Sequence, residues 1–118
     1  MKRILLVDDN PVNRELLREI LAFDSLEIEE AEDGMNALRL YEEIKPNLTI
    51  LDLQMPGLDG FQTLAGILAR DRNAVVIAVT AFAMRGDKER ALAAGFREYI
   101  TKPVEINHLR SRVRELLS

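Results

Sequence analysis

The sequence predicts an α/β protein, a doubly wound sandwich in which five parallel strands alternate with five helices. Short apolar runs rich in Val, Ile and Leu are typical of strands that are buried on both faces. Longer stretches with helical spacing of apolar residues lie between these runs, and glycine or proline marks many of the junctions. Regular alternation of strand and helix indicates a parallel sheet with right-handed crossovers.

The first strand and helix are predicted from the N-terminal residues. Residues 3–7 are predicted to form a strand, and its apolar residues from Ile4 to Val7 stop at Asp8. The helix begins behind Asn10 and Pro11, a capping residue followed by proline at the first helical position. Its apolar residues recur at helical spacing and therefore predict one buried stripe, formed by Val12, Leu16, Leu17, Ile20 and Leu21.

The rest of the chain repeats this order four times. Residues 26–30 alternate apolar and charged side chains, which predicts a half-exposed edge strand. Asp33–Gly34 marks the turn into the second helix, Asp59 is expected to cap the third, and Ala94–Gly95 predicts a left-handed cap after the fourth. The remaining strands are predicted at 47–52, 75–80 and 96–100, and the remaining helices at 34–44, 59–70, 84–94 and 105–117.

Composition excludes several classes of function. A chain of 118 residues suits one domain with one core, and we expect that domain to span 1–118. A net charge of −4 and a pI of about 5.1 argue against direct binding to nucleic acid or to anionic membranes. The absence of cysteine excludes disulfides and thiolate metal sites. No stretch approaches the roughly 18–20 apolar residues of a membrane span, so a cytoplasmic protein is expected.

Four predicted strands end in polar groups: Asp8–Asp9, Asp52, Thr80 and Lys102. In an open parallel sheet all carboxyl ends lie on one edge, and ligands bind there at the point where the strand order reverses. In the flavodoxin-like order 2-1-3-4-5 that point lies between the first and third strands. The sequence therefore predicts that these side chains, distant along the chain, share one crevice.

The chemistry of that crevice points to a metal and a phosphoryl group. Three carboxylates repel one another unless a cation neutralises them. Oxygen ligands without histidine or cysteine favour Mg²⁺, or a similar ion such as Mn²⁺. An ammonium from Lys102 and a hydroxyl from Thr80 would complete a site suited to phosphoryl oxygens.

These residues also carry a family resemblance. The motifs LLVDDN, AEDGMNAL, LDLQMPGLDG, AVTAF and EYITKP occur in this order. Together they make the chain similar to a response-regulator receiver domain of two-component signalling over essentially its whole length. The resemblance implies a flavodoxin-like (βα)5 fold, and a phosphoacceptor switch served by a sensor histidine kinase or a histidine phosphotransfer protein.

The resemblance also implies roles for individual residues. Asp52 is expected to attack a phosphohistidine and become an aspartyl phosphate. Asp9, Asp52 and the backbone carbonyl of Gln54 would ligate Mg²⁺ directly, whereas Asp8 would act mainly through water. Lys102 would pair with the phosphoryl group.

Further implied roles concern the response to phosphorylation and its duration. Thr80 would move to hydrogen-bond the phosphoryl group, Tyr99 would turn inward with it, and the bond before Pro103 is expected to be cis. Gln54 and Phe82 flank the path of the hydrolytic water in such domains. We expect Phe82 to obstruct this water and prolong the phosphorylated state.

Other noteworthy side chains have simpler interpretations. His108 lies beside Arg110 and Arg112 and is expected to be solvated. Met55 and Met84 are interpreted as packing residues.

The sequence thus predicts a phosphorylation-controlled binding module. Its responsive surface is expected to consist of the fourth helix, fifth strand and fifth helix. The expected partner is a downstream effector protein, and a phosphorylation-dependent dimer is a further possibility. One alternative is a Mg²⁺-dependent phosphohydrolase, although Gln54 stands where such enzymes commonly carry a second carboxylate. The others are a flavodoxin-like cofactor carrier and an inactive receiver that acts as a scaffold. Met1 and a last helix ending at Ser118 fit a stand-alone regulator slightly better than one module of a longer protein.

Overall fold

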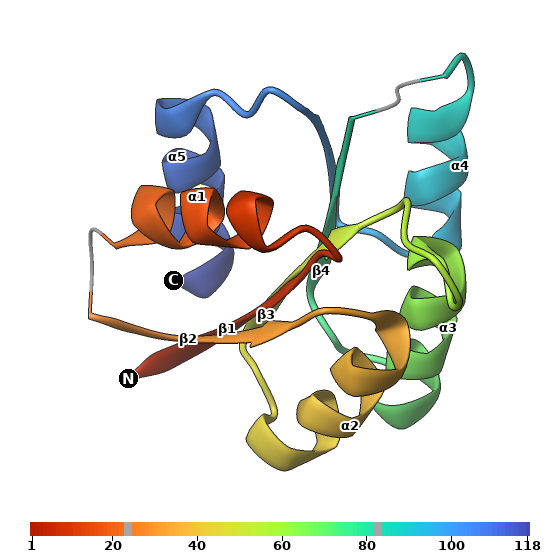
Figure 1. The fold of residues 1–118 in the computed structure, drawn as a ribbon, viewed down its shortest axis with the longest axis horizontal. Helices are drawn as coiled ribbons and strands as arrows, with labels where there is room; N and C mark the ends of the chain where they lie inside the picture. The colour runs from red at the N-terminus through yellow and green to blue at the C-terminus, as the bar shows by residue number, and fades with distance from the viewer. Residues whose placement is uncertain (23–24, 82–83) are drawn as a thin grey trace.

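The computed structural model describes residues 1–22, 25–81 and 84–118, and within them strands alternate with helices along the chain (Figure 1). The strand boundaries agree with the sequence-based prediction to within two residues. The strands are β1 (Lys2–Val7), β2 (Leu26–Ala31), β3 (Leu48–Asp52), β4 (Val76–Thr80) and β5 (Glu98–Thr101). The helices are α1 (Pro11–Leu21), α2 (Gly34–Ile44), α3 (Gly60–Arg70), α4 (Asp87–Ala94) and α5 (Ile106–Leu117).

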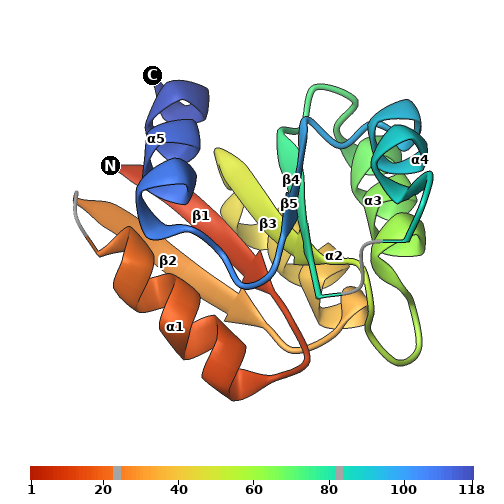
Figure 2. The same cartoon turned by 90° about the horizontal axis from the view of Figure 1, so that it is seen from above.

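The strands form one parallel sheet in the order β2-β1-β3-β4-β5, which confirms the predicted topology (Figure 2). The register aligns the strand ends: Val7 pairs with Leu51, Asp52 with Val79, and Thr80 with Thr101. The polar residues that end β1, β3 and β4 therefore lie on the same edge of the sheet.

Helices cover both faces of the sheet, α1 and α5 on one side and α2, α3 and α4 on the other (Figures 1 and 2). Successive strand residues point to opposite faces, so each strand contributes to both cores. In β1, Ile4 and Leu6 pack under α1 and α5, whereas Leu5 and Val7 pack under α2 and α3. Burial on both sides explains why the central strands read as continuous apolar runs.

Local side-chain chemistry sets most of the helix ends. The Asn10 side chain accepts hydrogen bonds from the backbone N–H groups of Val12 and Asn13, and so caps α1 as predicted. Asp59 and Gln62 form a reciprocal capping box at α3. Gly95 ends α4 in the left-handed conformation, with φ of 119°.

The fourth helix begins three residues later than predicted. Gly86 takes the left-handed conformation, with φ of 88°, and is the N-cap, so helical hydrogen bonding starts only at Asp87. Met84 lies before the helix and is 71% exposed, so its interpretation as a packing residue was wrong; Met55, in contrast, is buried in the core as expected.

The apolar stripes of the outer helices are only partly buried. Leu17, Ile20 and Leu21 of α1 pack on the sheet, but Val12 is 68% and Leu16 53% exposed. Val12 lies in the first turn of α1, and Leu16 lines the groove beside Lys102 and Pro103. On α5, Ile106 is likewise 46% exposed. Helical periodicity therefore identified the face of α1 but not how much of it the sheet covers.

None of the helices in the described ranges is long and apolar enough to cross a membrane.

Candidate functional site

Three carboxylates meet at the carboxyl edge of the sheet. Asp8 and Asp9 follow β1, Asp52 ends β3, and each offers an oxygen atom within 4.8 Å of the others. Asp8 and Asp52 are buried, with 2% and 7% of their surfaces exposed, whereas Asp9 is exposed. The neighbouring positions of β1 and β3 in the sheet bring together residues that are far apart in the sequence.

Asp8 is fixed by hydrogen bonds on several sides. Its backbone N–H donates to the Ala31 carbonyl at 3.2 Å, which continues the pairing of β1 with β2. Its Oδ1 accepts a hydrogen bond from the Asn10 backbone N–H at 2.9 Å, and its Oδ2 lies 3.0 Å from Lys102 Nζ. The carboxylate of Asp8 is therefore already oriented in this structure.

The surroundings of Asp52 disfavour its charged form. Burial raises the pKa of Asp52 to about 6, and the nearby charges of Asp8 and Asp9 act in the same direction. The Gln54 backbone N–H, which donates to Oδ1 at 3.1 Å, and the Lys102 ammonium, 3.7 Å from Oδ2, oppose this rise in pKa. A cation bound among these groups would favour the ionised, nucleophilic form.

Lys102 reaches the carboxylates from the end of β5. Its backbone N–H donates to the Thr80 carbonyl at 2.8 Å, the bond from Lys102 to Pro103 is cis, and its side chain is only 19% exposed. Thr80 itself is buried at the end of β4. Lys102 and Thr80 therefore stand on adjacent strands at the edge that carries the acidic residues.

Tyr99 lies two residues before the end of β5 and packs against the core beneath α2, α3 and α4. Its hydroxyl oxygen is buried and, among the described residues, has no hydrogen-bond partner. Burial raises the pKa of Tyr99, and the negative charges of Asp87 and Glu89 on α4 act in the same direction. Phe82, which together with Gln54 was expected to affect the lifetime of the phosphorylated state, lies outside the described residues.

The three carboxylates are suitable ligands for a hard divalent cation. Carboxylate oxygens so close together are the ligands that such ions prefer, and exposed Asp9 leaves an open side on which water ligands can remain. Asp9 and Asp52 would hold the ion, with Asp8 beside them.

Sequence reasoning missed Arg14. This α1 residue donates from Nη1 to the Asp8 backbone carbonyl at 2.5 Å and from Nε to Glu30 Oε1 at 2.9 Å. The sequence offered only a weak signal: an arginine in the first turns of the helix that follows the acidic pair.

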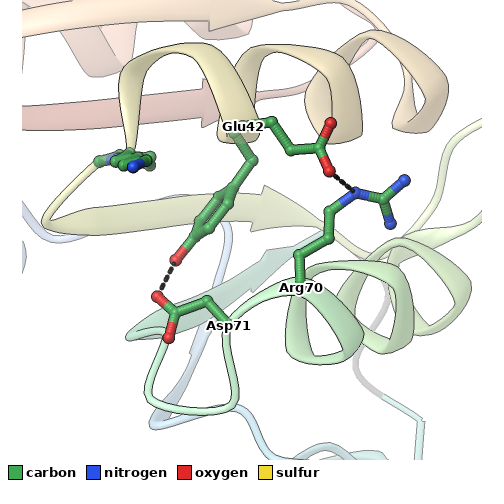
Figure 3. Close-up of a pocket in the computed structure, with 6 residues that line it drawn as sticks. Glu42, Arg70 and Asp71 are labelled. Atoms are coloured by element: carbon green, nitrogen blue, oxygen red, sulfur yellow. Dashed lines mark hydrogen bonds and ion pairs between the residues drawn. The ribbon is translucent and has the colours of Figure 1, made fainter.

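The most voluminous pocket described, about 520 Å³, lies away from the acidic residues, between α2 and the end of α3 (Figure 3). Glu42 and Arg70 form an ion pair across it at 3.1 Å, and the Tyr41 hydroxyl donates to Asp71 at 2.9 Å. These contacts join the carboxyl ends of two helices at the amino edge of the sheet. We assign them to the packing of α2 on α3.

Comparison with known proteins identifies the family. Residues 4–114 match the family model of the response regulator receiver domain. The chain is 34% identical over 118 residues to the polar-differentiation response regulator DivK of Brucella anthropi, covering 98% of this chain and 96% of that protein. It is also 34% identical over 110 residues to the chemotaxis protein CheY of Listeria monocytogenes, covering 92% of each.

Solved structures agree with this assignment. A CheY-like receiver domain from Methanospirillum hungatei superposes with a TM-score of 0.91 at 31% identity, over 99% of this chain and 94% of that one. CheY from Borrelia burgdorferi, solved as a CheX-CheY-BeF3-Mg²⁺ complex, gives 0.91 at 28% identity, over 99% and 90%. Superposition at this level over nearly the whole chain shows that both neighbours have the same fold as this chain. The chain belongs to the family of response regulator receiver domains.

Proposed function

We propose that the protein is a signalling switch that accepts a phosphoryl group on Asp52. The supporting observation is the position of this carboxylate, buried at the end of β3 between the acidic pair and the ammonium of Lys102. Family membership supports the same role, because receiver domains of the CheY and DivK type are response regulators.

The reaction transfers one phosphoryl group. An oxygen of the Asp52 carboxylate attacks the phosphorus of a phosphohistidine on a sensor kinase or phosphotransfer protein. The new O–P bond forms as the P–N bond breaks, and the bonding electron pair returns to the histidine nitrogen, which takes up a proton. Because the phosphoryl group ends on the protein itself, the product is a modified protein and not a released compound.

The chain's own residues prepare this step. Asp9, Asp52 and the Gln54 carbonyl would hold Mg²⁺, which would supply positive charge to offset the negative charge of the phosphoryl oxygens. In this structure Lys102 Nζ lies 3.0 Å from the Asp8 carboxylate, which holds the ammonium beside Asp52. Lys102 exchanges this partner for the phosphoryl group once it arrives, and Thr80 donates a hydrogen bond to another phosphoryl oxygen.

The response passes to the surface formed by α4, β5 and α5. Thr80 ends β4 next to β5. Burial raises the pKa of Tyr99 on β5, and the charges of Asp87 and Glu89 at the start of α4 add to this rise. Movement of Thr80 toward the phosphoryl group lets Tyr99 and α4 repack, and this altered surface controls an effector protein or a second receiver.

The phosphodonor protein docks beside Lys102. A groove of about 440 Å³ opens there, lined by Leu16, Leu17 and Ile20 of α1 and by Pro103 and Val104 after β5. A donor whose histidine reaches Asp52 has to cover this edge of the sheet, and the exposed apolar side chain of Leu16 is available for that contact.

The test is phosphorylation by a small phosphodonor such as acetyl phosphate, read by intact mass. With Mg²⁺ we expect one added phosphoryl group in the wild type, and none in Asp52→Asn or in the presence of excess EDTA. A phosphoryl group that persists in Asp52→Asn would refute the assignment of the acceptor.

The same assay can locate the surface on which the phosphodonor protein docks. For this purpose acetyl phosphate is replaced by a histidine-phosphorylated donor domain that phosphorylates the wild type. Leu16→Glu should slow transfer from the protein donor by about 10-fold or more, because it places a charge in the apolar contact. Its rate with acetyl phosphate should stay at the wild-type level. Equal rates for Leu16→Glu and wild type with the protein donor would place the docking surface elsewhere.

A further inference from the structure

Arg14 connects the acidic site to the edge strand of the sheet. Its guanidinium donates to two acceptors, the backbone carbonyl of Asp8 at 2.5 Å and the carboxylate of Glu30 on β2 at 2.9 Å. The side chain is only 15% exposed, so both bonds are largely shielded from solvent. The planar, multi-donor guanidinium can satisfy two acceptors in fixed directions at once.

The carbonyl that Arg14 holds belongs to the peptide between the two acidic residues. Fixing the oxygen of this peptide fixes its plane, and hence the direction in which Asp9 leaves the backbone. Asp9 is exposed, and among the described residues no side chain forms a hydrogen bond or ion pair with its carboxylate. The main-chain bond from Arg14 is therefore a major constraint on the orientation of Asp9.

Glu30 in turn fixes Arg14. Its two carboxylate oxygens are divided between Arg14, at 2.9 Å from Oε1, and Arg18, at 2.8 Å from Oε2. Burial raises the pKa of Glu30, but the hydrogen bonds and charges of Arg18 and Arg14 outweigh it, and the net pKa is lowered. Glu30 thus stays ionised at neutral pH and holds Arg14 in place.

Arg18 provides a natural comparison. It shares Glu30 with Arg14, but its other hydrogen bond goes to the Ile28 carbonyl of β2, two residues before Glu30 in the chain. Both arginines attach α1 to β2. Within the described contacts, only Arg14 also reaches the acidic pair.

We propose that Arg14 is a positioning residue that orients the Asp8–Asp9 peptide for binding of the divalent cation. This inference rests on the proposed function, because it assumes that the cation binds at Asp9 and Asp52. Outer contacts of this kind aim the residues that ligate a metal without touching it.

The test is the dissociation constant for Mg²⁺ alone, measured by isothermal titration on folded protein. Arg14→Gln should weaken Mg²⁺ binding by about 10-fold, the size of effect common for outer contacts of metal sites. Arg14→Lys keeps the charge and can reach one acceptor, so it should recover part of the affinity. The matched control Arg18→Gln loses a Glu30 partner as well, but should bind Mg²⁺ within about twofold of wild type, because the described contacts of Arg18 go to Glu30 and Ile28 and not to the acidic pair.

A second readout separates positioning from a general loss of structure. Phosphorylation of Arg14→Gln by acetyl phosphate should be slow at low Mg²⁺ and approach the wild-type rate at saturating Mg²⁺. Arg14→Gln and Arg18→Gln with equal Mg²⁺ affinities would overturn the proposal. If Arg14→Gln does not fold, Glu30→Gln decides: it should weaken Mg²⁺ binding, and an unchanged affinity would refute the role. A wild type that binds no Mg²⁺ would instead refute the proposed function itself.

Discussion

Asp8 and Asp9 are adjacent in the chain but differ in their surroundings. The backbone N–H, the carbonyl and both carboxylate oxygens of Asp8 each have a partner: Ala31, Arg14, Asn10 and Lys102. Asp9 is exposed and keeps its carboxylate available. At the scale of single residues, Asp8 is suited to orienting the site and Asp9 to direct ligation of a cation.

The two tyrosines allow a paired test of buried hydroxyl groups. Tyr41→Phe removes a hydrogen bond of 2.9 Å to Asp71 and should lower the free energy of unfolding by about 1 kcal/mol. Tyr99→Phe removes a buried hydroxyl that has no partner among the described residues, so stability should change by less than about 0.5 kcal/mol. Urea unfolding followed by far-UV circular dichroism measures both, and equal losses would contradict the contacts described here.

Among the helices, α4 is the least firmly attached to the rest of the fold. It has eight residues, buries only Ala91 of them, and begins at Gly86 without a side-chain cap. By contrast, α3 has a capping box and buries Gly60, Thr63, Leu64 and Ile67. An element with few buried contacts rearranges at a low free-energy cost, which would suit the surface that we propose responds to phosphorylation of Asp52.

Hydrogen exchange tests this difference between helices. Amides in the hydrogen-bonded turns of α4 should exchange about 10-fold or more faster than those of α3, because α4 opens without unfolding the core. Phosphorylation of Asp52 should change the protection of α4 more than that of α3, which serves as the internal control. Equal protection of the two helices would argue against α4 as the mobile part of the switch.

For the molecule as a whole, the sheet collects like charges at one edge. The fold places three carboxylates within 4.8 Å of one another, with the ammonium of Lys102 beside them. Without a cation, ionised Asp52 destabilises the folded state, as its raised pKa of about 6 indicates. The proposed function therefore opposes stability at this edge, and a bound cation would offset the repulsion.

This conflict predicts an unusual dependence of stability on pH. The pKa of Asp52 is about 6 in the folded state against 3.8 ordinarily, so the folded state holds the proton more tightly. The stabilisation that protonated Asp52 gives the folded state is fully present below pH 3.8 and is lost as the pH rises through about 6. In metal-free buffer at pH 7 to 8, Asp52→Asn should therefore be more stable than wild type, by about 1–3 kcal/mol.

Thermal unfolding at several pH values measures this effect. The advantage of Asp52→Asn should shrink from pH 7 toward pH 4, and saturating Mg²⁺ should stabilise wild type more than the variant. If Asp52→Asn were less stable than wild type at pH 7 without metal, ionised Asp52 would not destabilise the folded state.

Much of the fold could be predicted because its signals are local. Apolar periodicity located the strands and helices, and Asn10, Asp59 and Gly95 act as caps as expected. The start of α4 was predicted wrongly because the backbone of Gly86 adopts a left-handed conformation that periodicity does not reveal. Exposure of Val12 and Leu16 was also missed, because helical spacing alone does not show which residues of an apolar stripe reach the sheet.

By itself the sequence determined the alternation of strands and helices and the polar residue at the end of each central strand. These features depend on neighbours a few residues apart. Only the tertiary structure decided which polar groups meet: Lys102 lies nearer to Asp8 than to Asp52, at 3.0 Å against 3.7 Å, and Arg14 holds the Asp8 carbonyl. The reason is physical, since these contacts depend on the relative placement of elements that only packing across the sheet brings together.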